Sequence, residues 1–215
     1  MVRRRRQFGN MLLSRTPILT SRHHLLPKYR TIRHNSLQRG ALEGVIETPA
    51  GLLRVYSLHL ADLIAEERLE QIAALFALNE RAVRDGWPWS GADSRRSELW
   101  QQSGAAPEMP AEAIFMGDFN LEPGSPEYEA IVGPKRADIG RILVGHKLVD
   151  AWAATGHGED KGVTLYADPA VDAPVSTRLD YCFVTAGLAP RLKDCWIDDG
   201  AEGSDHQPVW VEMDL

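Results

Sequence analysis

The chain has 215 residues, a formal net charge of −6 and 44% hydrophobic residues. This is enough apolar material for a sizeable core, and no run approaches the roughly 18 consecutive apolar residues of a membrane-spanning helix. The two cysteines, Cys182 and Cys195, are too few for a disulfide-stapled secreted scaffold, and neither lies in a CxxC pair. The composition therefore indicates a soluble globular protein and excludes a zinc knuckle.

Positive charge is concentrated at the start of the chain. Residues 1–42 contain ten Lys or Arg and no acidic residue, whereas the remainder contains 14 basic and 30 acidic residues. An Arg-rich, acid-poor opening is typical of a transit peptide, and a nucleic-acid-binding arm through Arg3–Arg6 fits equally well. The third interpretation is a basic stretch inside an ordinary domain.

The first half of the chain predicts strands followed by a helix. Residues 8–20 hold a short apolar run before Pro17, which predicts a strand that ends in a loop. Residues 41–47 and 52–60 are rich in strand formers around a Pro-Gly turn, which predicts a hairpin with His59 at the end of its second strand. Residues 61–83 then show helical spacing of apolar residues.

The second half alternates short elements with loops. Residues 85–110 lack periodicity and predict a long loop, whose Trp87, Trp89 and Trp100 either flank a substrate or pack the loop onto the core. Short elements follow, including a helix that opens at Ser125-Pro126. We expect strands or short elements over 113–116, 148–154, 178–185, 192–197 and 208–215. This order favours a single layered α/β domain over residues 1–215.

Two segments place carboxylates beside other polar groups. In Gly117-Asp118-Phe119-Asn120, after a predicted strand, Asp118 and Asn120 project to the same side of extended chain, although Gly and Asn also mark ordinary turns. In Ser204-Asp205-His206-Gln207-Pro208 the adjacent Asp and His diverge, so one suits a metal ion and the other the substrate. The alternative for the second segment is a polar turn before an edge strand.

Two further segments are ambiguous by themselves. In Arg178-Leu179-Asp180-Tyr181, Asp180 lies among apolar residues and needs a partner. It either orients a histidine, as in hydrolytic triads, or makes a structural contact with Arg178 or the backbone. His59, in Ser57-Leu58-His59-Leu60, lies at a strand end, where ligand sites of α/β sheets gather, although a lone histidine is more often structural.

Together, SLHL, GDFN, RLDY and SDHQP occur in the order of one family, and the chain resembles the endonuclease/exonuclease/phosphatase superfamily of magnesium-dependent phosphoesterases. FGNMLLSRTPI, with Asn10, also resembles a family segment, so the basic opening looks like domain interior. The resemblance covers about residues 7–214. It implies a DNase I-like α/β sandwich of two mixed sheets flanked by helices.

The resemblance also implies a role for each site residue. Water attacks phosphorus in line, and either Asp118 or His206 takes its proton. Asn120 and His59 contact the phosphate together with Asn10 and His206, and Asp180 orients His206. Asp205 corresponds to a metal ligand for magnesium, with manganese as an alternative.

One departure from the family concerns the start of the chain. The family's opening strand, helix and strand, with a metal-binding glutamate, have no counterpart before Asn10. We therefore expect Met1 to be a mis-assigned start or the chain to be truncated, and the usual glutamate partner of Asp205 to be absent.

The resemblance leaves the substrate open. Beyond residue 42 the chain is acidic, which favours a small phosphomonoester or phosphodiester over nucleic acid. The alternatives are a catalytically impaired relative and a nucleic-acid-binding protein or nuclease. No protein partner is implied, and the absence of targeting signals predicts a cytoplasmic location, which an upstream signal would change.

Overall fold

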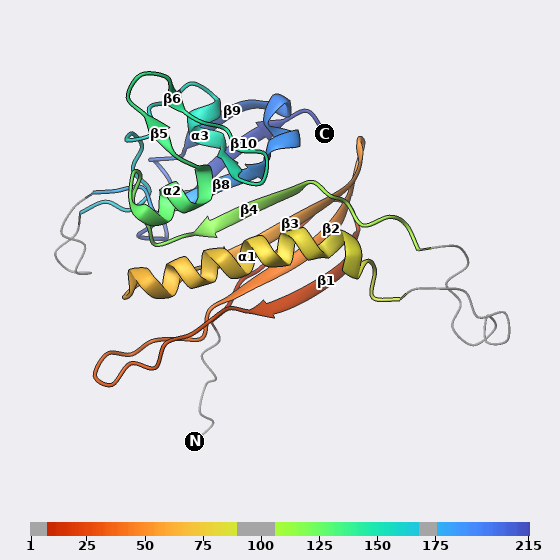
Figure 1. The fold of residues 1–215 in the computed structure, drawn as a ribbon, viewed down its shortest axis with the longest axis horizontal. Coiled ribbons are helices and arrows are strands. Elements are labelled where there is room, and N and C mark those ends of the chain that lie inside the picture. The colour runs from red at the N-terminus through yellow and green to blue at the C-terminus, as the bar shows by residue number, and fades with distance from the viewer. Residues whose placement is uncertain (1–7, 90–105, 168–175) are drawn as a thin grey trace, which may run out of the picture.

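The computed structural model describes residues 8–89, 106–167 and 176–215. The elements run in chain order as strands interrupted by helices (Figure 1): β1 Ile18–Leu25, β2 Gly40–Thr48, β3 Gly51–His59, α1 Ala65–Asp85, β4 Ala113–Asp118, α2 Pro126–Val132, β5 Lys135–Arg136, β6 Gly140–Arg141, β7 Leu148–Asp150, α3 Ala151–Ala154, β8 Asp180–Thr185, a 3₁₀ helix Ala186–Arg191, β9 Leu192–Ile197 and β10 Val209–Met213.

Six strands form the central sheet, in the order β1-β2-β3-β4-β8-β7. Strands β3 and β4 are parallel and connected through α1, whereas the neighbouring pairs β1–β2, β2–β3, β4–β8 and β7–β8 are antiparallel. Strands β9 and β10 pair with each other in a separate two-stranded sheet. The class is therefore mixed α/β, as predicted, and the second layer of the expected sandwich is this short β9–β10 pair.

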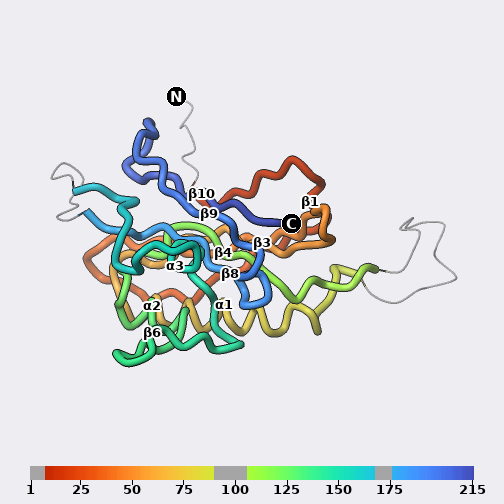
Figure 2. The backbone as a smooth tube through the Cα atoms, turned by 90° about the horizontal axis from the view of Figure 1, so that it is seen from above, coloured from red at the N-terminus to blue at the C-terminus, as the bar shows by residue number. Residues whose placement is uncertain are grey.

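Helices α1 and α2 cover one face of the central sheet, and the second sheet covers the other. Figure 2 shows α1 and α2 on one side of the strands and β9 and β10 on the other. Alternation along the strands supplies an apolar cluster to each face. Tyr56, Phe115 and Phe183 pack toward Ile72 of α1, whereas the intervening residues, including Val55 and Ile114, pack with Cys195 and Val211 of the second sheet.

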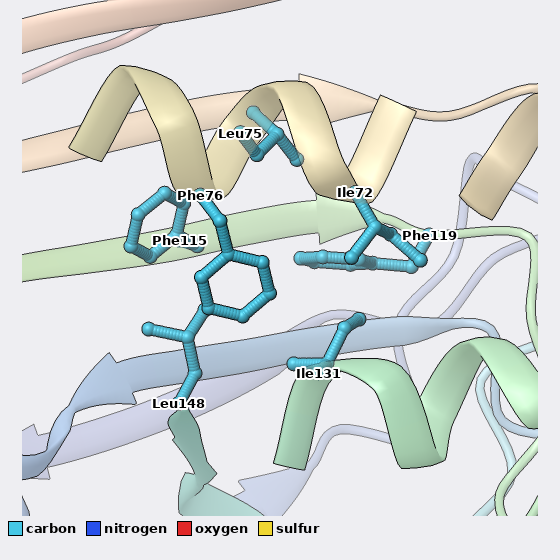
Figure 3. Close-up of a pocket in the computed structure, with 7 residues that line it drawn as sticks. All are labelled: Ile72, Leu75, Phe76, Phe115, Phe119, Ile131 and Leu148. Atoms are coloured by element: carbon cyan, nitrogen blue, oxygen red, sulfur yellow. The ribbon is translucent and has the colours of Figure 1, made fainter. Parts of the chain in front are cut away.

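The interface between helices and sheet contains a small apolar cavity of about 10 Å³ (Figure 3). Its lining comes from α1, α2, β4 and the residues next to it, and β7: Ile72, Leu75, Phe76, Phe115, Phe119, Ile131 and Leu148. The cavity is lined by apolar side chains only and offers no polar partners to a water molecule, so it is a packing gap in the core.

Most predicted elements are confirmed, with one exception at the start. The hairpin, the long helix and the strand at 192–197 lie where the sequence places them. The strand predicted within residues 8–20 is wrong, because residues 8–15 have no regular structure and β1 begins only after Pro17. The Ser14 hydroxyl accepts a bond from the Thr16 amide at 3.2 Å, a local turn that replaces strand pairing.

Two of the three tryptophans in the predicted long loop lie in the described part of the chain. Trp87 is buried and packs with Val45, Ala82 and Met109, and Trp89 packs against this cluster. These two residues therefore pack the loop onto the core, and Trp100 lies outside the described residues. Within the described ranges, no helix is both long and apolar enough to cross a bilayer.

Candidate active site

The predicted site residues come together because β3 and β4 end, and the antiparallel β8 begins, at the same end of the central sheet. In the sheet register His59 of β3 pairs with Asp118 of β4, and Asp118 pairs with Asp180 of β8. Neighbouring strands lie about 4.8 Å apart, so the three side chains form a short row. Residues that are far apart in sequence thus become adjacent through strand pairing alone.

The end of β4 and the turn after it explain the GDFN sequence. Gly117 has a φ of +141°, and a Cβ atom there would overlap the carbonyl oxygen of Leu58 on β3, so only glycine fits. Asn120 adopts φ +50°, a conformation that Asn tolerates. Its amide N–H donates to Asp118 Oδ1 at 2.8 Å, and its Nδ2 donates to the Leu60 carbonyl at 3.0 Å.

Asp180 contacts a histidine and not Arg178. Its Oδ2 lies 2.7 Å from Nδ1 of His206, a charge-assisted hydrogen bond that leaves the Nε2 of the ring for other contacts. Arg178 instead pairs with Asp150 at 3.0 Å, in an ion pair whose two side chains are each 2% exposed. The structural alternative for Asp180, a contact with Arg178, is therefore wrong.

His59 lies close to Asp118 without forming an ion pair. Its Nε2 is 3.2 Å from Asp118 Oδ2. Burial and the nearby Arg39 lower the pKa of His59 to about 4, so the imidazole is neutral at pH 7. Phe8 packs against the ring at a centroid distance of 5.5 Å, and Arg39 lies over Phe8 and pairs with Asp62 at 3.1 Å.

The pKa values of Asp118 and His206 are both raised, and the two shifts suit these groups to different roles. Burial, followed by the neighbouring Asp180, raises the pKa of Asp118 to about 6. The hydrogen bond with Asp180 raises the pKa of His206 to about 9. At pH 7 the site therefore holds an ionised Asp118, poised to accept a proton, close to a protonated imidazole, and such poised groups are typical of acid–base catalysis.

Two other predicted residues lie at the margin of this row. Asn10 donates through Nδ2 to the carbonyl of Gly40 at 2.6 Å, and Gly40 is paired with His59. Asp205 is exposed, next to His206, with its Oδ1 3.5 Å from the hydroxyl of Ser204. Asn10 is thus anchored beside the site, whereas Asp205 faces solvent on the loop before β10.

A complete metal site is not present in the described part of the chain. Among residues 8–89, 106–167 and 176–215, no three His, Cys, Asp or Glu side chains cluster in a way that could hold a metal ion. Asp205 is one exposed carboxylate, and Asp118 and Asp180 are engaged by Asn120 and His206. The described side chains therefore do not fit a resident metal ion by themselves.

Sequence reasoning assigned no role to two residues that shape the site. Arg39 is 6% exposed and depresses the pKa of His59, but the sequence shows it only as one of ten basic residues. Thr164 is fully buried and accepts hydrogen bonds from two backbone amides at the start of β8. Arg39 carries no local signal, whereas Thr164 lies in Gly162-Val163-Thr164, which resembles a family segment. The role of each residue still depends on which distant segment packs against it.

The fold and this arrangement of acids and imidazoles agree with a family assignment. The chain belongs to the Endonuclease/Exonuclease/phosphatase family, whose model matches residues 2–206. None of the curated proteins compared with the sequence matches it significantly.

Solved structures share the fold at low sequence identity. An endonuclease/exonuclease/phosphatase from Bacteroides vulgatus is 19% identical with a TM-score of 0.55, and the match covers 93% of this chain and 66% of that one. A mannosyl-6-phosphatase from Bacteroides thetaiotaomicron is 18% identical, with a TM-score of 0.52 and coverages of 93% and 67%. TDP2 from D. rerio, complexed with single-strand DNA product, is 18% identical, with a TM-score of 0.55 and coverages of 90% and 66%. The chain thus spans about two thirds of the length of these structures.

Proposed function

We propose that this protein hydrolyses phosphoester bonds, as a phosphatase or phosphodiesterase, by in-line attack of an activated water. The observation that carries the proposal is the row of His59, Asp118 and Asp180 at one end of the central strands, with His206 hydrogen-bonded to Asp180 at 2.7 Å. A buried carboxylate with a raised pKa beside an imidazole held by a second carboxylate can move a proton and contact a phosphate in one site. Family membership supports the same reaction class.

The geometry supports a division of roles between the two acids. Asp118, ionised at pH 7, accepts the proton of the attacking water, and Asp180 fixes the ring of His206 through Nδ1. The Nε2 of His206 then donates to a phosphoryl oxygen, where charge develops in the transition state. Asn120 and the neutral His59 orient the water and the phosphate, and Asn10 contributes a further amide beside them.

A divalent cation forms a separate part of the proposal. Magnesium, or manganese, would bind the carboxylate of Asp205, an oxygen ligand of the type that hard cations prefer. Because the described side chains do not complete a metal site, binding is tested directly by calorimetric titration of the wild type and of Asp205→Asn with each cation. Identical heats for the two proteins would remove Asp205 from the proposal.

The favoured substrate is a small phosphoester, with nucleic acid as the second candidate. One structural feature favours the second: the segment between β1 and β2 leaves from the site end of the sheet and exposes Lys28, Arg30 and Arg33. The basic run Arg3–Arg6, the other candidate contact, lies outside the described residues. Binding of single-stranded DNA that weakens steeply with salt, and weakens further in a triple Ala variant of the loop, would favour nucleic acid.

The decisive experiment measures hydrolysis of a nitrophenyl phosphate monoester and diester, with magnesium and with chelator. We expect turnover in the wild type and its loss in His206→Ala, with unchanged circular dichroism as evidence of folding. Folded wild-type protein without turnover on either substrate would contradict the proposal and favour a catalytically impaired family member. Turnover that His206→Ala retains would place the chemistry elsewhere.

A further inference from the structure

Thr164 joins the start of β8, which carries Asp180, to the loop that carries His206. The residue is 0% exposed. Its Oγ1 accepts hydrogen bonds from the amides of Leu179 and Asp180, at 2.9 and 3.1 Å, at the point where β8 begins. A single buried oxygen thus satisfies two backbone donors next to the carboxylate that holds His206.

The backbone of the same residue holds the other loop. The Thr164 carbonyl accepts from the amide of Gln207 at 2.7 Å, and Leu165 forms an isolated β-bridge with His206. The Thr164 amide also donates to the carbonyl of Thr177 at 3.0 Å. Thr164 therefore contacts the chain on both sides of the Asp180–His206 hydrogen bond, through its side chain on one side and its backbone on the other.

We propose that Thr164 is a positioning residue, which sets the distance and orientation of Asp180 relative to His206 without touching the substrate. The hydroxyl oxygen is the part of Thr164 that reaches Asp180, whereas the bond to Gln207 is backbone and survives any substitution. Removing the oxygen leaves two buried amides unpaired, and the start of β8 moves to satisfy them. The kinetic consequence rests on the proposed function, but the structural consequence does not.

The variants Thr164→Val and Thr164→Ser separate the oxygen from the shape of the side chain. Valine keeps the branched shape and loses the acceptor, whereas serine keeps the acceptor and loses a methyl group. Thr185→Val is the matched control, because Thr185 lies at the opposite end of β8, where its hydroxyl accepts from the amide of Ala113 at 3.0 Å and bonds to Glu112. Both valine variants break a threonine contact with a strand, but only one does so beside Asp180.

The structural readout is the imidazole N–H resonance of His206 in protein labelled with ¹⁵N-histidine, assigned by its absence in His206→Gln. A proton held between Nδ1 and a carboxylate exchanges slowly and resonates far downfield. We expect the signal in the wild type, Thr164→Ser and Thr185→Val, and its loss or broadening in Thr164→Val. A signal that Thr164→Val keeps at the wild-type position would overturn the proposal.

The kinetic readout uses the same four proteins on the nitrophenyl substrates. We expect Thr164→Val to lower kcat by about 10- to 100-fold with KM little changed, Thr164→Ser to restore it within a few-fold, and Thr185→Val to leave it near the wild type. Equal losses in Thr164→Val and Thr185→Val would mean a general stability effect and contradict the positioning role. If the wild type has no turnover, the proposed function fails while the resonance still decides the role of Thr164.

Thr164→Val could also fail to fold, and one measurement on the wild type covers that outcome. The amides of Leu179 and Asp180 should exchange with deuterium as slowly as the ladder amides within β8, because both are bonded to a buried oxygen. Fast exchange at these two amides would overturn the proposal without any variant.

Discussion

His59 and Asp118 occupy paired positions at the ends of the parallel strands β3 and β4, which brings Nε2 within 3.2 Å of Oδ2. The close approach of these strands depends on Gly117, and Asn120 ties the chain after β4 to Leu60, the residue that follows β3. The site is therefore built by strand register and one tight turn, and its carboxylate is partly removed from water as a result.

The burial of Asp118 predicts that this residue lowers stability. Its pKa is raised from 3.8 to about 6, so the folded state holds the proton more tightly than the unfolded state. The free energy of unfolding from this group then falls as pH rises from about 4 to 6 and stays low above that. Asp118→Asn should be more stable than the wild type by about 1–3 kcal/mol at pH 7, and by little at pH 4.

Urea unfolding at both pH values measures this difference, and equal stabilities at pH 7 would contradict it. The same variant should lose turnover by about 10²- to 10⁴-fold, because an amide cannot accept the proton. In the wild type kcat/KM should rise with pH through about 6, as Asp118 ionises. A flat profile between pH 5 and 7 would argue against Asp118 as the proton acceptor.

The hydrogen bond between Asp180 and His206 predicts that their substitutions are not additive. Asp180→Asn removes the carboxylate that raises the pKa of His206 to about 9, so the ring loses both its fixed orientation and the proton that Nε2 donates, which should lower kcat by about 10²- to 10⁴-fold. His206→Ala should lose about as much. The double variant should lose no more than the worse single variant, because the two residues act as one unit. Losses that multiply would show that the two side chains act independently.

The element boundaries and much of the site follow from the sequence, whereas the buried contacts do not. The spacing of apolar residues places His59, Asp118 and Asp180 at the ends of predicted strands, and the order of the motifs predicts that they share a site. Thr164 and the pairing of Arg178 with Asp150 depend on which distant segments pack together, and no local pattern encodes that. The strand prediction within residues 8–20 is wrong for the same reason. Met11 to Leu13 form an apolar run typical of a strand, but strand pairing begins only after Pro17.

Gly117, within β4, offers a test of the close approach of β3 and β4 that holds the site. Gly117→Ala introduces a Cβ that overlaps the carbonyl oxygen of Leu58, and backbone on β3 cannot move without breaking strand pairing. We expect a loss of more than about 3 kcal/mol in the free energy of unfolding. Gly124→Ala is the control, with a φ of +78° but nothing within 4 Å of the added atom, and should lose about 1 kcal/mol. Similar losses in the two variants would mean that φ strain, and not the clash, makes glycine necessary.

The buried pair of Arg178 and Asp150 should be the most sensitive ion pair in the described part of the chain. Arg178 also donates to the carbonyls of Glu159 and Lys161, and Asp150 accepts from the Tyr128 hydroxyl at 2.9 Å. Arg178→Met leaves the carboxylate of Asp150 buried without its cation, which costs about 3–5 kcal/mol. Tyr128→Phe removes one neutral donor and should cost about 1 kcal/mol.

The exposed pair of Arg136 and Asp138 provides the comparison, with an N–O distance of 2.7 Å and side chains that are 60% and 59% exposed. Arg136→Met should change the free energy of unfolding by less than about 1 kcal/mol, because solvent already screens the pair. Urea denaturation of the three variants measures all the differences under one condition. If Arg178→Met were as mild as Arg136→Met, water would have to reach Asp150, and the closed packing of Arg178, just before β8, against Asp150 at the end of β7 would be wrong. A large loss confined to Arg178→Met would instead show that Arg178, two residues before Asp180, anchors the chain that leads into β8 through its pair with Asp150.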